Sequence, residues 1–149
     1  MSGGRAPGID GVAGGPARAD GRRQEHMAPG SAEPFSHYTD AVRADGLLFV
    51  SGCVPIDGEG RLVGGDDVQE QARQVFRNIG AILATAGATF ADVVKVTLYL
   101  THIDDRAAIN VVRKEVFGDV RPASTLVEVS RLLVPGARLE IEAVALLPA

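Results

Sequence analysis

The segment 66–87 constrains the fold most strongly, because its apolar residues recur at the spacing of one helix face. Asp66 or Asp67 can accept hydrogen bonds from the first-turn amides of a helix, and Gly87 suits its C-terminal end. The apolar residues between them are Val68, Ala72, Val75, Phe76, Ile79, Leu83 and Ala86. This spacing predicts a long amphipathic helix that must pack against another element.

Residues 92–101 carry the clearest strand pattern, because they alternate in polarity and are rich in β-branched side chains. The alternation is expected to place Val94, Val96, Leu98 and Leu100 on one face and Val93, Lys95, Thr97 and Tyr99 on the other. Two shorter strands are expected at 40–45 and 47–51, joined by a turn at Asp45-Gly46. A loop with several turn residues follows at 55–65.

A second helix is expected to begin at Asp104, as its N-cap, and to end at Gly118. Its buried stripe is expected to be Ile109, Val112, Val116 and Phe117. Two more strands are expected at 124–131 and 138–147, with a loop between them around Pro135-Gly136. The predicted element order is β-β-α-β-α-β-β, an α+β fold.

Two amphipathic helices can cover only one face of such a sheet. The other face also holds apolar side chains, such as Val93 and Val127. We therefore expect an oligomer in which sheet packs against sheet.

Residues 1–32 differ in composition from the rest of the chain. They are rich in Gly, Ala, Pro and Arg and have almost no large apolar side chains. Such a segment buries too little surface to offset its ordering entropy, so it is expected to be a disordered extension. Met27 is an alternative start of the natural chain. The folded domain is expected to span 33–149.

The composition argues against several classes of function, although it leaves room for a local basic patch. The net charge of the 149 residues is −4, whereas nucleic-acid binding needs a basic face, and aromatic residues make up only 5%. A single cysteine rules out an internal disulfide and favours a cytoplasmic protein. No apolar run is long enough to cross a membrane. The histidine and cysteine residues show no zinc-ligand spacing, and there is no P-loop or Rossmann motif.

Four segments together resemble one known family. HYTDAV (37–42), LLFVSGCVP (47–55), RPASTLVEV (121–129) and RLEIEAVAL (138–146) are similar, in this order, to segments of the Rid (reactive intermediate deaminase, YjgF) family. The resemblance spans about residues 34–147. It implies a chorismate-mutase-like fold and a homotrimer with a ligand pocket at each subunit interface. It also implies hydrolysis of enamines and imines to carbonyl compounds and ammonia, without a metal or organic cofactor.

The resemblance implies one acidic residue beside the reacting water, and Glu140 matches it. Imine hydrolysis needs a carboxyl group that positions water and moves protons, together with an anchor for the substrate. Glu140 is therefore the candidate catalytic residue. The alternative is a solvated strand glutamate or an ion-pair partner of Arg138 or Arg131.

Other pocket residues are matched by position. Tyr38 matches a pocket tyrosine, with an interface aromatic as the alternative, and Ser51 and Gly52 match a turn whose backbone lines the pocket. Cys53 stands where glutamine is usual and is read as a small buried thiol at the pocket edge, because nothing adjacent in sequence would activate it. His37 is a possible titratable group at the pocket mouth, although an exposed loop histidine is the simpler reading.

Ser124 is the departure from the family pattern, because it aligns with the arginine that grips the substrate carboxylate. A serine cannot reproduce a bidentate ionic clamp. Arg121, Arg131 and Arg138 lie nearby in sequence, but a surface or ion-pair role is favoured for each, and Glu128 is read as structural. The expected function is thus deamination of an enamine or imine other than simple 2-aminoacrylate. The alternatives are a non-catalytic trimer that binds small molecules or has a regulatory or chaperone-like role, and, less favoured, a ribonuclease.

Overall fold

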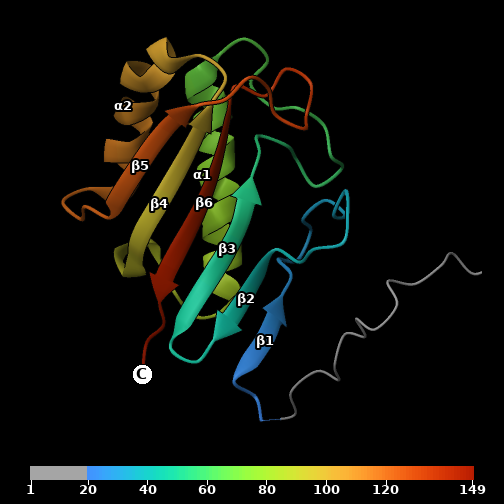
Figure 1. The fold of residues 1–149 in the computed structure, drawn as a ribbon, viewed down its shortest axis with the longest axis vertical. Helices are drawn as coiled ribbons and strands as arrows, with labels where there is room; N and C mark the ends of the chain where they lie inside the picture. Colours follow the sequence, from blue (N-terminus) through green and yellow to red (C-terminus); the bar gives the residue numbers. More distant parts are fainter. Residues whose placement is uncertain (1–19) are drawn as a thin grey trace, which may run out of the picture.

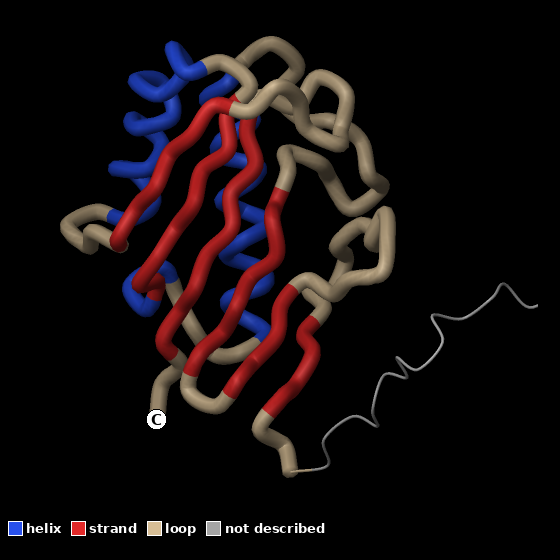
Figure 2. Tube along the Cα trace, viewed as in Figure 1, coloured by secondary structure: helices blue, strands red, loops and turns tan. Residues whose placement is uncertain are grey.

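The described residues, 20–149 of a computed structural model, form one six-stranded sheet with two helices on the same face (Figures 1 and 2). The strand order is β1-β2-β3-β6-β4-β5; β4 and β5 run parallel and the other neighbours antiparallel. The strands are β1 Arg23–His26, β2 Ala41–Ala44, β3 Leu47–Cys53, β4 Val93–Leu100, β5 Ala123–Glu128 and β6 Leu139–Leu146. The helices are α1 Val68–Thr85 and α2 Arg106–Phe117, with 3-10 turns η1 Phe90–Asp92 and η2 Ile103–Asp105. The predicted α+β architecture is confirmed.

Helix α1 forms as its sequence predicts. The Asp67 carboxylate accepts hydrogen bonds from the amides of Gln69 at 3.0 Å and Glu70 at 3.2 Å, which caps the first turn. Gly87 follows the last turn with a φ of +71°, a conformation that favours glycine. The predicted apolar stripe faces the sheet and is largely buried.

The core lies between the helices and the sheet. Leu48, Leu98 and Ile141 project from β3, β4 and β6 and are completely buried. At one end of the core, three phenylalanine rings pack edge to face, with centroids 5.5–6.0 Å apart. They are Phe76 of α1, Phe90 of η1 and Phe117 of α2.

The start of β4 differs from the prediction. A register shift between Val93 and Lys95 places Val93 in the core and leaves Val94 44% exposed. The bulge adds one residue and so reverses the alternation at this point. The prediction that put Val93 on the open face was wrong, whereas Val96, Leu98 and Leu100 face the core as expected.

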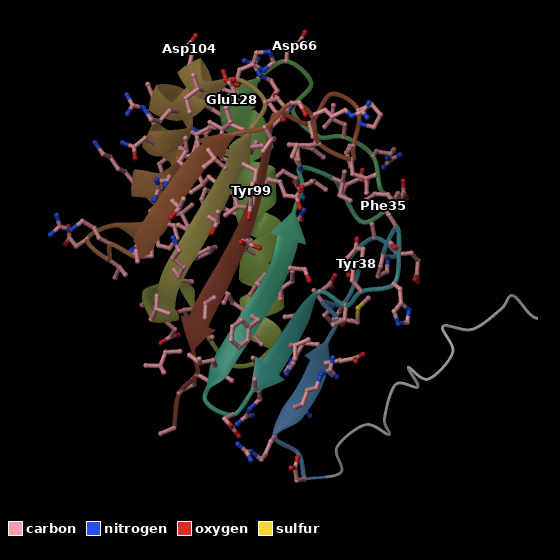
Figure 3. All side chains as sticks on the ribbon, in the orientation of Figure 1. Phe35, Tyr38, Asp66, Tyr99, Asp104 and Glu128 are labelled. Carbon is pink, nitrogen blue, oxygen red and sulfur yellow. The ribbon has the colours of Figure 1, made fainter. Side chains whose placement is uncertain are left out.

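The start of α2 also differs from the prediction. Asp104 is exposed and caps nothing, and Asp105 is the residue before the helix, without a side-chain cap bond. Asp105 turns inward because Arg138 donates to its carboxylate, at 2.8 Å from Nε. The Ile103 amide instead donates to the Glu128 carboxylate, 2.8 Å away at the end of β5. A partner distant in sequence therefore replaces the predicted cap (Figure 3).

Part of the expected N-terminal extension belongs to the sheet. Strand β1 pairs antiparallel with β2, and Ala28 is buried in the core. The boundary at residue 32 was therefore wrong for this part, because backbone pairing rather than apolar side chains holds β1 in place. Residues 1–19 lie outside the described residues, so the expected disorder there stays a prediction.

The face of the sheet opposite the helices exposes several large apolar side chains: Leu47, Phe49, Val94, Val127 and Leu146. Five such residues on neighbouring strands form an apolar surface without cover from the described part of this chain. Neither helix within residues 20–149 is long and apolar enough to span a membrane.

Candidate active site

A cavity of about 490 Å³ opens beside the ends of β3 and β6. Its walls come from the loop between β1 and β2, the turn after β3, one side of α1 and residues 133–134. Figure 3 shows Phe35 and Tyr38 together on the first of these loops. Five residues predicted from sequence line the cavity: Tyr38, Ser51, Gly52, Cys53 and Glu140. Strands far apart in sequence thus bring together most of the predicted site.

Glu140 is a half-buried carboxyl group in the wall of the cavity, and its pKa is raised. It lies on β6 in register with Tyr99 of β4, on the face away from the helices. Burial raises the pKa of Glu140, and the nearby charge of Glu142 adds to this effect. No hydrogen-bond donor or cation within residues 20–149 offsets the burial. The predicted alternative of an ion pair with Arg138 does not apply, because Arg138 pairs with Asp105.

The side chain of Glu140 occupies the space that a Cβ atom at Gly52 would need. A Cβ atom at this position would overlap Glu140 Oε1 and lie 2.9 Å from its Cδ. The β3 ladder is also irregular between Val50 and Cys53. The β3 backbone at Gly52 therefore approaches the carboxyl group more closely than any side chain would allow.

Hydrogen bonds around Ser51 fix the shape of the cavity wall. The Ser51 hydroxyl donates to the Thr39 carbonyl at 2.7 Å, which ties β3 to the loop that carries Tyr38. The Asp40 carboxylate accepts from the amide of Ala28 and the hydroxyl of Ser31, both at 2.9 Å. Ser51 therefore holds β3 against the loop between β1 and β2, while Asp40 ties the two ends of that loop together.

Cys53 is a buried thiol at the edge of the cavity, as the sequence predicts. Burial, together with the charges of Asp40 and Glu140, raises the pKa of Cys53 to about 12. The thiol contacts the Ser51 carbonyl at 3.5 Å. Because the thiolate is the nucleophilic form, this cysteine is inert near neutral pH.

Sequence reasoning missed Asn78, which positions the turn after β3. Its side-chain amide donates to the carbonyls of Val54 at 3.1 Å and Ile56 at 3.0 Å. The sequence offered one sign of this role: Asn78 is a polar residue directly before Ile79, which belongs to the apolar stripe of α1. Leu133 and Val134, which also line the cavity, carried no such signal.

Three predicted residues do not line this cavity. His37 and Arg121 are exposed, and Ser124 lies on β5, the edge strand separated from β6 by β4. The Ser124 hydroxyl accepts a hydrogen bond from Arg113 of α2 at 3.1 Å. Within the described part of the chain, no group of three or more His, Cys, Asp or Glu side chains is placed to hold a metal ion.

The fold and the cavity together define a class: an α+β protein whose cavity holds a partly buried carboxyl group against a strand glycine. The family model described as endoribonuclease L-PSP matches residues 28–147. The chain is 46% identical over 114 residues to a RutC family protein of Pyrococcus horikoshii, covering 76% of this chain and 89% of the relative. It is 40% identical over 120 residues to human 2-iminobutanoate/2-iminopropanoate deaminase, covering 80% and 84% respectively.

Solved structures with the same fold come from the same family as the sequence relatives. Escherichia coli TdcF with bound serine superposes with a TM-score of 0.77 at 31% identity, covering 84% of this chain and 99% of that chain. RidA from the Antarctic bacterium Psychrobacter gives a TM-score of 0.78 at 32% identity, covering 83% and 99%. The chain belongs to the Rid (YjgF) family, which includes proteins named imine deaminases. The fold and family expected from the sequence are confirmed.

Proposed function

We propose that this protein is a hydrolytic deaminase of a reactive enamine or imine, on a substrate other than simple 2-aminoacrylate. The observation that carries the proposal is the raised pKa of Glu140 in the wall of a cavity large enough for a small metabolite. A carboxyl group that keeps its proton closer to neutral pH can both donate and accept a proton during one reaction cycle. The imine deaminase name of the human relative supports the same reaction class.

The chemistry fits the groups in the cavity. An enamine takes up a proton at carbon, loses one from nitrogen and becomes an imine. Water then adds across the C=N bond, with its oxygen on carbon and a proton on nitrogen, and the carbinolamine collapses to a carbonyl compound and ammonia. Glu140 would orient the water and accept its proton, then return a proton to the departing nitrogen. Tyr38, whose hydroxyl accepts from the Phe35 amide at 3.3 Å, lines the same cavity and would contact the substrate.

The substrate restriction rests on Ser124. A hydrogen bond to a charged group contributes about 1.5–3 kcal/mol, so loss of an arginine clamp should weaken a small carboxylate substrate at least about tenfold. A larger substrate recovers that binding energy through further contacts with the apolar walls around Ile82 and Leu133.

The proposal includes a homotrimer with a pocket at each subunit interface. The exposed apolar surface of the sheet supports such an assembly, because it needs cover that the described helices do not provide. In this arrangement the β5 edge of one copy borders the cavity of the next. Both Glu140 and Ser124 would then face a single substrate.

The second candidate is a non-catalytic trimer that binds small molecules or a protein partner, and it is favoured by the absence of arginine at position 124. A ribonuclease is less favoured, since the net charge is −4.

Ammonia release from imines generated in situ by an amino-acid oxidase tests the proposal. A panel should include imines with small and large side chains, and a Ser124→Arg variant serves as the comparison. We expect turnover of larger imines by the wild type and improved use of the smallest one by Ser124→Arg. If no imine is hydrolysed while small ligands still bind, the non-catalytic candidate is correct; degradation of RNA by the pure protein would favour the ribonuclease.

A further inference from the structure

The loop between β5 and β6 forms one wall of the cavity, although little of the described chain holds it in place. Leu133 and Val134 of this loop line the cavity, and the Leu133 side chain is 72% exposed. On its other side the loop borders a second hollow, beside Thr101 and His102. Open space on both sides leaves the loop little packing support, so its position depends on hydrogen bonds.

Gln71 supplies the hydrogen bond that ties this loop to the rest of the chain. Its side chain lies on α1 and is completely buried. Nε2 donates to the Gly136 carbonyl at 3.0 Å, and within the described chain this is the one hydrogen bond between residues 130–136 and another element. The Ala137 amide donates to the Val134 carbonyl at 3.1 Å and closes the turn that contains Gly136. Gln71 is therefore connected to the cavity wall through a single short turn.

Two further hydrogen bonds hold the Gln71 side chain in one orientation. Nε2 also donates to the Gly65 carbonyl at 2.6 Å, and Oε1 accepts from the Arg138 amide at 2.8 Å. Gly65 lies in the loop before α1, at the same end of the sheet as the loop between β5 and β6 (Figure 1). Both amide protons and the oxygen of Gln71 are thus in use, so the side chain is a fixed anchor for the loop.

We propose that Gln71 is a positioning residue of the cavity, which holds Leu133 and Val134 where they contact a bulky apolar part of the substrate. Gln71 does not line the cavity, so it acts only through the loop. The proposal rests on the proposed function, because it takes this cavity as the substrate site. It deepens that function by naming the residue that maintains the apolar wall and so gives the preference for bulky substrates.

The opposing explanation is that Gln71 only satisfies buried backbone groups and so stabilises the fold. Both explanations predict a lower melting temperature when the amide is removed. Only a positioning role predicts that the loss of affinity depends on ligand size, because a displaced wall affects the ligands that reach Leu133 and not the small ones. Leu133→Ala, at a position exposed to solvent, should then show the same size dependence without loss of stability.

Binding of cyclohexanone and acetone, a bulky and a small ketone, separates these explanations. We expect ligand-observed NMR to show that wild-type protein prefers cyclohexanone. Gln71→Met should weaken cyclohexanone binding about fivefold or more and leave acetone binding unchanged. Leu133→Ala should give the same pattern, and adding Gln71→Met to it should weaken binding little further.

Two more variants complete the experiment. Gln69→Met is the matched control, because it makes the same change on the same helix at a side chain without a hydrogen-bond partner among residues 20–149. It should change neither affinity. Gln71→Glu keeps the acceptor for the Arg138 amide but loses the donor for Gly136, and it replaces Gln71→Met if that variant does not fold. Thermal unfolding shows which variants are folded.

Four results would each overturn the positioning role. They are an equal loss of both ketones or an unchanged affinity in a folded Gln71 variant, wild-type binding by Leu133→Ala, no binding of either ketone by wild type, and unfolding of both Gln71 variants. Turnover separates this role from the reaction, since Gln71→Met should raise KM for bulky imines with little change in kcat. If no imine is hydrolysed but cyclohexanone binding depends on Gln71, the reaction fails and the positioning role stands. If imines are hydrolysed with an unchanged KM in Gln71→Met, the reaction stands and the positioning role fails.

Discussion

Glu140 Oε1 fills the space that a side chain at Gly52 would need. This contact between β6 and the last residues of β3 places a carboxyl group in the wall of the cavity, directly against the backbone. The fold thus holds Glu140 in place by steric fit rather than by a hydrogen bond or an ion pair from the described residues. The same fit makes Gly52 a sensitive site for testing the role of the carboxyl group.

Replacement of Gly52 by alanine should lower turnover without unfolding the protein. The new methyl group meets the flexible end of Glu140, which can move away, so the fold survives while the carboxyl group leaves its position. A displacement of about 1 Å can cost about a hundredfold in rate. Steady-state ammonia release and a thermal melt measure the two effects. Unchanged turnover in a folded Gly52→Ala protein would mean that the position of Glu140 is not important.

Cys53 should be dispensable for chemistry. Its pKa of about 12 leaves almost no thiolate at neutral pH, so Cys53→Ala is expected to retain turnover within a few fold. Iodoacetamide should label the wild-type thiol much more slowly than it labels a free thiol such as glutathione. Loss of all activity in a stable Cys53→Ala variant, or rapid labelling at neutral pH, would contradict this prediction.

The raised pKa of Glu140 should appear in the pH dependence of stability. The folded protein retains the Glu140 proton to higher pH than the unfolded chain does, so this group's contribution to stability falls as pH rises from the ordinary glutamate range through the folded pKa. Glutamine does not titrate. Glu140→Gln should therefore gain stability relative to wild type across that window, as denaturant unfolding at several pH values would show. A difference that is independent of pH would exclude the pKa shift.

Phe49 tests the proposed assembly. It is 47% exposed on the open face of the sheet, opposite Val144 of β6. Phe49→Glu places a charge in the proposed interface and should yield protein with the mass of the single chain, 15.5 kDa, by light scattering, whereas wild type should have three times that mass. Val111→Glu, at an equally exposed position of α2, is the control and should leave the mass of the assembly unchanged. A wild-type monomer would contradict the assembly.

Helices and turns were predicted correctly where residues close together in sequence determine their conformation. The stripe of α1, the cap at Asp67 and the turn at Asp45-Gly46 depend on neighbours in sequence, and all three formed as expected. The prediction of element boundaries failed where contacts between residues distant in sequence determine the structure. Asp105 rather than Asp104 precedes α2 because Arg138 draws its carboxylate inward, and β1 forms because β2 offers it a free edge.

The candidate site was predictable to a similar extent. Resemblance to the Rid family placed Glu140, Gly52 and Cys53 correctly at one cavity. The contact between Arg113 and Ser124 could not be foreseen, because it depends on how α2 packs beside β5. Arg113 is therefore near Ser124 in space, whereas Arg121 and Arg131 are nearer to it in sequence.

Turnover of Glu140→Gln shows whether the Glu140 carboxyl group drives imine hydrolysis. Glutamine keeps the size of the side chain but cannot transfer the proton, so ammonia release from the best wild-type imine should fall by a factor of about 10² or more. Glu115→Gln, which alters a glutamate paired with Arg73 on the helix side, is the control and should retain wild-type turnover. Wild-type turnover by a folded Glu140→Gln protein would contradict the claim.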